Sequence, residues 1–196
     1  MSMMNVSGKI YKLERNAIWL LVFHHDVTIG EFFVSQEEGK KCFNYTGGKY
    51  SILYSLNNEY RINGKFEFLL EYPEKNKSNQ WRQSNNPLRQ SMIYNKNVTG
   101  YQPIDIQMSQ AAWGGLYVKP AGSSTLIAGS INGLWHYSIG TINKEYYPCF
   151  PGPGTDSKIV SLWVRVRGEP NKCTLRGKTN AIPKLSIFVC FSLCVS

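Results

Sequence analysis

Short runs of Ile, Val, Phe, Tyr and Trp recur along most of the chain, separated by clusters of Gly, Asn, Pro and Ser. Runs of this length and composition are typical of single β-strands. Seven or more short strands with turns between them indicate two packed antiparallel layers. We therefore predict strands at residues 17–23, 50–54, 65–72, 115–118, 124–128, 134–139 and 159–166.

One of these runs also shows the alternation of a strand with one buried face. Phe66, Phe68 and Leu70 are expected on one side, with Glu67 and Glu71 on the opposite, solvated side. Asn-Gly and Gly-Gly pairs between runs accept the positive φ of tight hairpin turns, so neighbouring strands should be antiparallel. The predicted fold class is all-β: an antiparallel β-sandwich of the jelly-roll, concanavalin A-like type.

The expected boundaries of the sandwich are residues 17 and 166. Residues 1–16 precede it as an N-terminal segment, and residues 167–196 follow it as an irregular tail that is first basic and then apolar. A chain of 196 residues is long enough for one domain with a hydrophobic core.

The net charge of +9 comes from 22 basic and 13 acidic residues, and it is unevenly distributed. Six basic residues and one acidic residue lie between positions 165 and 184, so five of the nine units belong to that short stretch. The aromatic residues fall at strand spacing, where core packing explains them. A nucleic-acid partner is therefore not favoured, and a glycan or a protein assembly is the expected partner.

The residues of hydrolytic or metal chemistry do not occur in the required patterns. His24 and His25 are adjacent on a predicted strand and point to opposite faces, so they cannot chelate one ion. Glu67 and Glu71 lie roughly 13 Å apart along one strand, too far for a glycosidase pair. We predict no cofactor, no metal and no enzyme; a polysaccharide hydrolase or lyase would need an acid from another strand, such as Asp105.

The polar stretch 73–101 is the expected binding surface, because it is too polar for the core and too long for a hairpin loop. Within it Trp81 is followed by Arg82, Gln83 and Asn85, and Trp113 lies farther along the chain. An aromatic face beside amide and guanidinium donors is typical of sites that hold sugars or other polar ligands. The alternative is that these tryptophans belong to the core.

The apolar runs 17–23 and 185–195 are too short to span a membrane. No secretory signal is recognised at the N-terminus, which favours an intracellular location and leaves the compartment undetermined. The five cysteines have no metal-ligand spacing and are interpreted as free thiols. A bond between Cys42 and Cys149 stays open, because a pairing cannot be deduced from sequence.

Seven motifs in a fixed order resemble a largely uncharacterised, lectin-like β-sandwich module that is expanded in protists and also seen in simple animals. The motifs are FEFLLEYP (66–73), WRQSNNP (81–87), WGGL (113–116), STLIAGS (124–130), WHYSIG (135–140), PGP (151–153) and VSLWVRV (160–166). The resemblance covers residues 17–166. It implies a non-catalytic module for binding or assembly, and it supplies no ligand residues.

These observations lead to two hypotheses about function. The first is a non-catalytic module that binds a glycan or similar polar ligand through tryptophan-containing loops. The alternative is an intracellular structural protein that docks onto a protein or cytoskeletal assembly.

Overall fold

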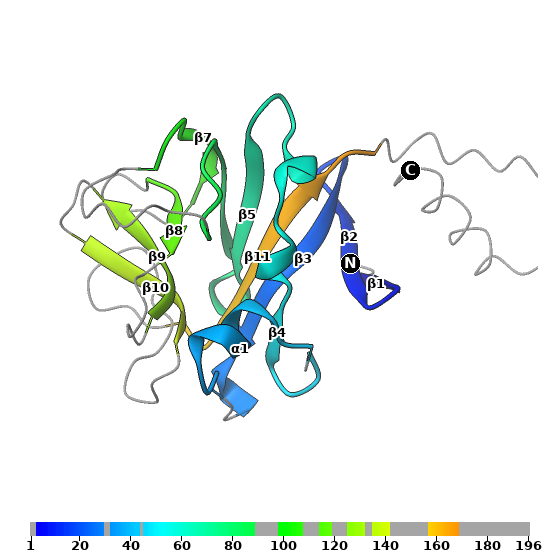
Figure 1. Ribbon diagram of the computed structural model, residues 1–196, viewed down its shortest axis with the longest axis vertical. Coiled ribbons are helices and arrows are strands. Elements are labelled where there is room, and N and C mark those ends of the chain that lie inside the picture. The colour runs from blue at the N-terminus through cyan, green and yellow to red at the C-terminus, as the bar shows by residue number, and fades with distance from the viewer. Residues whose placement is uncertain are drawn as a thin grey trace, which may run out of the picture.

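The computed structural model describes residues 3–29, 32–43, 45–88, 98–107, 114–118, 125–131, 135–141 and 157–168. Within these ranges the chain is mostly β, with antiparallel strands and almost no helix (Figure 1). The only α-helix among the described residues is α1 (Gln36–Lys40). Short 3-10 turns are η1 (Val27–Ile29), η2 (Leu53–Ser55), η3 (Asn58–Tyr60) and η4 (Pro73–Lys75).

Eight strands form one large antiparallel sheet in the order β1-β2-β3-β11-β5-β6-β7, with β4 also paired to β3. Figure 1 shows β5, β11, β3 and β2 side by side across it. A smaller sheet has the order β10-β9-β8. The bounds are β1 (Met3–Val6), β2 (Lys9–Glu14), β3 (Ala17–Asp26), β4 (Lys49–Ser51), β5 (Phe66–Tyr72), β6 (Lys77–Gln83), β7 (Gln102–Ile106), β8 (Leu116–Val118), β9 (Thr125–Ile131), β10 (Trp135–Thr141) and β11 (Ile159–Val166).

The sheet begins before the expected boundary at residue 17, because β1 and β2 extend it beyond β3. Two adjacent residues with positive φ connect β1 to β2 (Ser7 and Gly8) and β2 to β3 (Arg15 and Asn16). This is the geometry of two-residue hairpin turns that match the twist of the strands. The predicted Asn63-Gly64 turn is confirmed, because both residues have positive φ between the bridged pair Ile62 and Lys65.

β3 pairs with β11 from Ile18 to Asp26 on one side. On its other side two shorter strands follow each other: β2 pairs with residues 17–20, and β4 pairs with residues 23–25. β2 and β4 therefore share one edge of the same strand and diverge around its middle. The tail after residue 168 lies outside the described residues.

One face of the large sheet carries the hydrophobic core. The predicted alternation is confirmed on this face, where Phe66, Phe68 and Leu70 are completely buried. The ring of Phe68 lies 5.6 Å from that of Trp81 on β6. The segment before β4 also contributes, since Phe33 stacks on Phe23 of β3 at 5.4 Å.

The opposite face is closed to solvent at Glu67, and that part of the prediction is wrong. Glu67 is 1% exposed and accepts hydrogen bonds from Arg82 Nε (2.8 Å), Arg165 Nη1 (3.2 Å) and Gln80 Nε2 (3.0 Å). Because each donor comes from β6 or β11, the carboxylate is neutralised by the two strands that flank β5. Sequence position alone could not show these partners.

Glu71 belongs to a second cluster on this face. It accepts hydrogen bonds from Lys12 Nζ (2.5 Å) and from Trp163 Nε1 (2.6 Å). Lys12 is completely buried, also pairs with Glu14 (2.7 Å), and lies 4.4 Å from the centre of the Trp163 ring. A buried ammonium with two carboxylates and an aromatic face has replaced its hydration shell with protein groups.

The polar face is strongly concave, as the contacts of Arg15 require. Arg15 follows β2, yet its guanidinium donates to Ser78 Oγ (3.1 Å) and Gln80 Oε1 (2.8 Å) on β6 and to Asp105 Oδ2 (3.2 Å) on β7. In a flat sheet β2 and β6 would lie four strand spacings apart, or about 19 Å. The sheet must curl until its two sides approach each other across the polar face.

Replacing Lys12 with Met is expected to lower the free energy of unfolding by about 3 kcal/mol, because Glu71 would lose its cation on a half-buried face and Glu14 would keep only Arg15. Adding Glu71→Gln should recover part of the loss. Chemical denaturation of the two single variants and the double variant measures the coupling.

Lys40→Met is the control, because Lys40 pairs with the exposed Glu37 on α1 and should cost less than about 0.5 kcal/mol. Equal losses for Lys12→Met and Lys40→Met would contradict the role assigned to the buried ammonium.

Candidate functional site

The expected binding surface at residues 73–101 is not one loop. Lys77–Gln83 form β6 and pair along their length with β5, which places Trp81 opposite Phe68. Trp81 is completely buried, so its ring is not available to a ligand. The core interpretation of Trp81 therefore replaces the stacking platform, and Trp163 is buried too, at 1% exposure.

The polar neighbours of Trp81 form internal hydrogen bonds. Gln83 is completely buried; its Oε1 accepts from Trp81 Nε1 (2.8 Å) and Leu116 N (3.0 Å), and its Nε2 donates to Leu116 O (3.0 Å) and Asn85 O (2.9 Å). Asn85 Oδ1 accepts from Thr99 N (3.0 Å). The structure thus brings Trp81, Gln83 and Asn85 together as a link between β6 and β8.

Gly115 shows how closely the two segments pack. A Cβ atom there would lie 2.8 Å from Gln83 Oε1 and 3.2 Å from Trp81 Nε1, and the residue has a φ of +86°. Both observations favour glycine at this position. The remaining predicted residues are Arg82, which pairs with Glu67 on the concave face, and Trp113, which lies outside the described residues.

Gln83→Ala should lower the free energy of unfolding by about 2–4 kcal/mol, because it removes the acceptor of the Trp81 Nε1–H and Leu116 N–H groups and a donor to Leu116 O. Urea denaturation measures this. Gln102→Ala, on the exposed part of β7, is the matched control and should change stability by less than about 0.5 kcal/mol. Equal stability of the two variants would contradict the stabilising role of Gln83 between β6 and β8.

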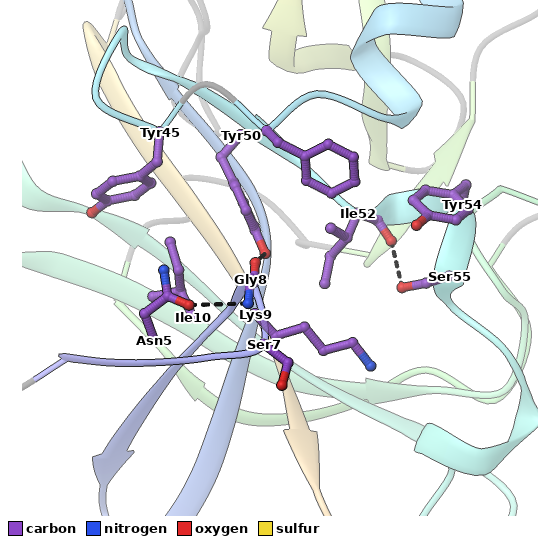
Figure 2. A pocket seen from close by; sticks show the side chains of 11 residues that line it. Asn5, Ser7, Gly8, Lys9, Ile10, Tyr45, Tyr50, Ile52, Tyr54 and Ser55 are labelled. Atoms are coloured by element: carbon purple, nitrogen blue, oxygen red, sulfur yellow. Dashed lines mark hydrogen bonds between the residues drawn. The ribbon is translucent and has the colours of Figure 1, made fainter.

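A pocket of about 360 Å³ lies where β2 and β4 diverge (Figure 2). One wall is the β1–β2 turn with the start of β2, and the other is β4 with the residues that lead into η2. The residues that line it are Asn5, Ser7, Gly8, Lys9, Ile10, Phe43, Tyr45, Tyr50, Ile52, Tyr54 and Ser55.

Four of the lining residues are aromatic, and they differ in exposure. Tyr50 is buried and forms the floor together with Ile10 and Ile52. Phe43 is 58% exposed and Tyr54 is 54% exposed, so each presents a ring at the mouth of the pocket. Large exposed rings around a hollow are a feature of binding sites rather than of ordinary surface.

Local hydrogen bonds hold the two walls in place. Asn5 Oδ1 accepts from Gly8 N (3.1 Å) inside the β1–β2 turn, and Tyr50 Oη donates to Gly8 O (3.2 Å) across the pocket. Ser55 Oγ donates to Ile52 O (2.7 Å) on the far wall. The hydroxyl of Tyr50 is thus the direct link between the β1–β2 turn and β4.

Burial determines the protonation of the pocket tyrosines. It raises the pKa of Tyr50 to about 12. Burial also raises the pKa of Tyr45, with smaller contributions from the carboxylates of Asp26 and Glu71. Both hydroxyls are therefore protonated and neutral at physiological pH, and they are hydrogen-bond donors.

The chemistry of the lining favours binding over catalysis. Among the described residues that line the pocket there is no carboxylate and no histidine, which are the usual general acids and bases. Across the described part of the chain, no group of three or more His, Cys, Asp or Glu residues could hold a metal ion. Cys42 is a buried free thiol, and Cys149 lies outside the described residues.

The sequence does not predict this pocket, because five of its eleven lining residues belong to residues 1–16, which lie outside the expected domain. Two features of the sequence do indicate these elements. Ser7-Gly8 is a turn pair followed by the alternating run of β2, and tyrosines recur at 45, 50 and 54.

Comparison of the chain with protein-family models, with curated proteins and with solved structures finds no significant match. The lectin-like resemblance consequently stays a prediction. No helix in the described ranges has the length and apolar character needed to cross a membrane.

The stability of the fold should fall as the pH rises from about 10 to 12. The pKa of Tyr50 is about 12 in the folded state and about 10 when unfolded, so its contribution is complete below pH 10 and is lost above it. Tyr101, whose pKa burial also raises to about 12, acts in the same direction.

Between pH 9 and 11 the free energy of unfolding of Tyr50→Phe should fall by about 1 kcal/mol less than that of the wild type. Urea denaturation at both pH values tests this, and the double variant with Tyr101→Phe should lose less still. Parallel losses in the wild type and Tyr50→Phe would contradict the assignment.

Proposed function

We propose that this chain is a non-catalytic binding module that recognises a glycan or a similar polar ligand in the pocket between the β1–β2 turn and β4. The observation that carries the proposal is the pair of exposed rings, Phe43 and Tyr54, at the mouth of a hollow that also presents hydroxyl and amide groups. A sugar offers an apolar C–H face to a ring and hydroxyl groups to the rim.

The size and composition of the pocket support this class of ligand. Its volume of about 360 Å³ lies within the usual range of ligand pockets, about 300–1,000 Å³. Asn5, Ser7 and Ser55 supply polar side chains, and Tyr45 and Tyr54 add hydroxyl groups. The resemblance to a lectin-like, jelly-roll β-sandwich points in the same direction, although its motifs lie on other segments of the chain.

A polysaccharide-cleaving enzyme is the less favoured hypothesis. The carboxylate of Glu67 is buried between two guanidinium groups, and Glu71 is paired with Lys12. Asp105 pairs with Arg15 and accepts from Gln107 Nε2 (2.9 Å). Carboxylates held in ion pairs on the concave face are poorly placed to donate or accept a proton from a substrate in this pocket.

A glycan array followed by calorimetry on the best binder tests the proposal. Tyr54→Ala and Phe43→Ala should each weaken binding about tenfold by removing a stacking surface. Tyr54→Phe keeps the ring and should retain most of the affinity. Because both rings are more than half exposed, thermal unfolding of the variants should be close to that of the wild type.

Ile104→Ala is the control, because Ile104 is an exposed apolar residue on β7, outside the pocket. It should leave binding unchanged. Binding to no glycan, or equal affinities for Tyr54→Ala, Phe43→Ala and the wild type, would contradict the proposed function.

A further inference from the structure

We propose that the pocket selects a saccharide that carries a negatively charged substituent, a carboxylate or a sulfate group. This inference rests on the proposed function and narrows its ligand class. It follows from the charges around the pocket and from how the other cations of the protein are used.

Among the described residues that line the pocket, Lys9 is the only charged one. Figure 2 shows its side chain extending toward the side of the pocket formed by Tyr54 and Ser55. None of those described lining residues carries a carboxylate to oppose it. The interior therefore offers a ligand one full positive charge together with neutral hydrogen-bonding groups.

Lys41 adds a second positive charge on the same side. Its Nζ lies 5.3 Å from the centre of the Tyr54 ring, over the ring face. A ligand that contacts Tyr54 would thus lie close to the Lys41 ammonium, and Lys9 extends toward the same side of the pocket. Two cations on one side of the pocket attract an anion and disfavour a cationic ligand.

Neither ammonium forms an ion pair with a described residue. Lys12, Lys40 and Lys49 each form an ion pair with a glutamate. Within the described part of the chain, neither Lys9 nor Lys41 has a carboxylate within 4.0 Å. Their charge is available to a ligand without breaking an existing pair.

The pocket is also asymmetric, which orients the ligand. Tyr45 lies on the opposite side from Tyr54 in Figure 2, and it is the tyrosine whose surroundings include Asp26 and Glu71. A carboxylate thus acts on Tyr45, whereas an ammonium lies over the ring of Tyr54. An anionic substituent should point toward Tyr54, with the hydroxyl groups of the sugar toward Tyr45.

Matched saccharide pairs test the inference by calorimetry at 50 and 300 mM NaCl. The pairs are a uronate oligosaccharide with its carboxyl-reduced form, and a sulfated oligosaccharide with its desulfated form. The acidic member of at least one pair should bind ten times more tightly at 50 mM NaCl, and the difference should shrink at 300 mM because salt screens the interaction. The pair that shows it distinguishes carboxylate from sulfate.

Lys9→Gln and Lys41→Gln should each weaken binding of the acidic member at least fivefold and leave the neutral member unchanged. Lys77→Gln is the matched control, because it removes the same charge from an exposed position at the start of β6. Melting temperatures confirm that each variant is folded.

The possible failures are distinguishable. If neutral and acidic members bind equally, the inference is overturned and the proposed function stands. An equal effect of Lys77→Gln and Lys9→Gln would assign the preference to the net charge of +9 and would also overturn the inference. Binding of no saccharide in any arm would refute the inference and the proposed function together.

Discussion

The hydrogen bonding of β3 is the constraint on which the rest of the structure depends. This ten-residue strand bonds to β11 along one edge, and its other edge is divided between β2 and β4. Both edges of β3 are hydrogen-bonded, but no single strand pairs along the whole of the second edge. Where β2 and β4 diverge, the β1–β2 turn and β4 form the walls of a pocket. The same pairing that completes the sheet therefore creates its candidate site.

The curl of the sheet creates a second interior, and it is polar. Burying Lys12, Glu67 and their partners costs desolvation that ion pairing and hydrogen bonds must offset, so such a network is weak evidence for high stability. It is stronger evidence for a fixed register. A one-residue slip of β5 would move Glu67 and Glu71 to the apolar face and separate them from Arg82, Arg165 and Lys12. The network thus disfavours alternative pairings of the strands around it.

The sequence predicts structure correctly where it follows from local pattern, and incorrectly where the partners come from distant strands. The alternation in β5 identified Phe66, Phe68 and Leu70, because core-facing positions repeat every two residues. It places the glutamates on the correct face but predicts solvent around them, since their cations lie on β2, β6 and β11. The polar neighbours of Trp81 predict a loop, yet the Gln83 amide forms hydrogen bonds with the backbone of Leu116 inside the protein. Polarity signals exposure only when no internal partner exists, and sequence does not show that partner.

The ion pairs on the concave face also explain why the pocket carries positive charge. Glu14, Glu67 and Glu71 are committed to cations there, and Glu37 and Glu38 pair with Lys40 and Lys49 around α1. Lys9 and Lys41 lie at the ends of elements whose carboxylates are already engaged, Lys9 at the start of β2 and Lys41 after α1. The distribution of ion pairs, more than the overall excess of basic residues, leaves positive charge beside Tyr54. A site built this way gains its electrostatic preference from what the fold has neutralised elsewhere.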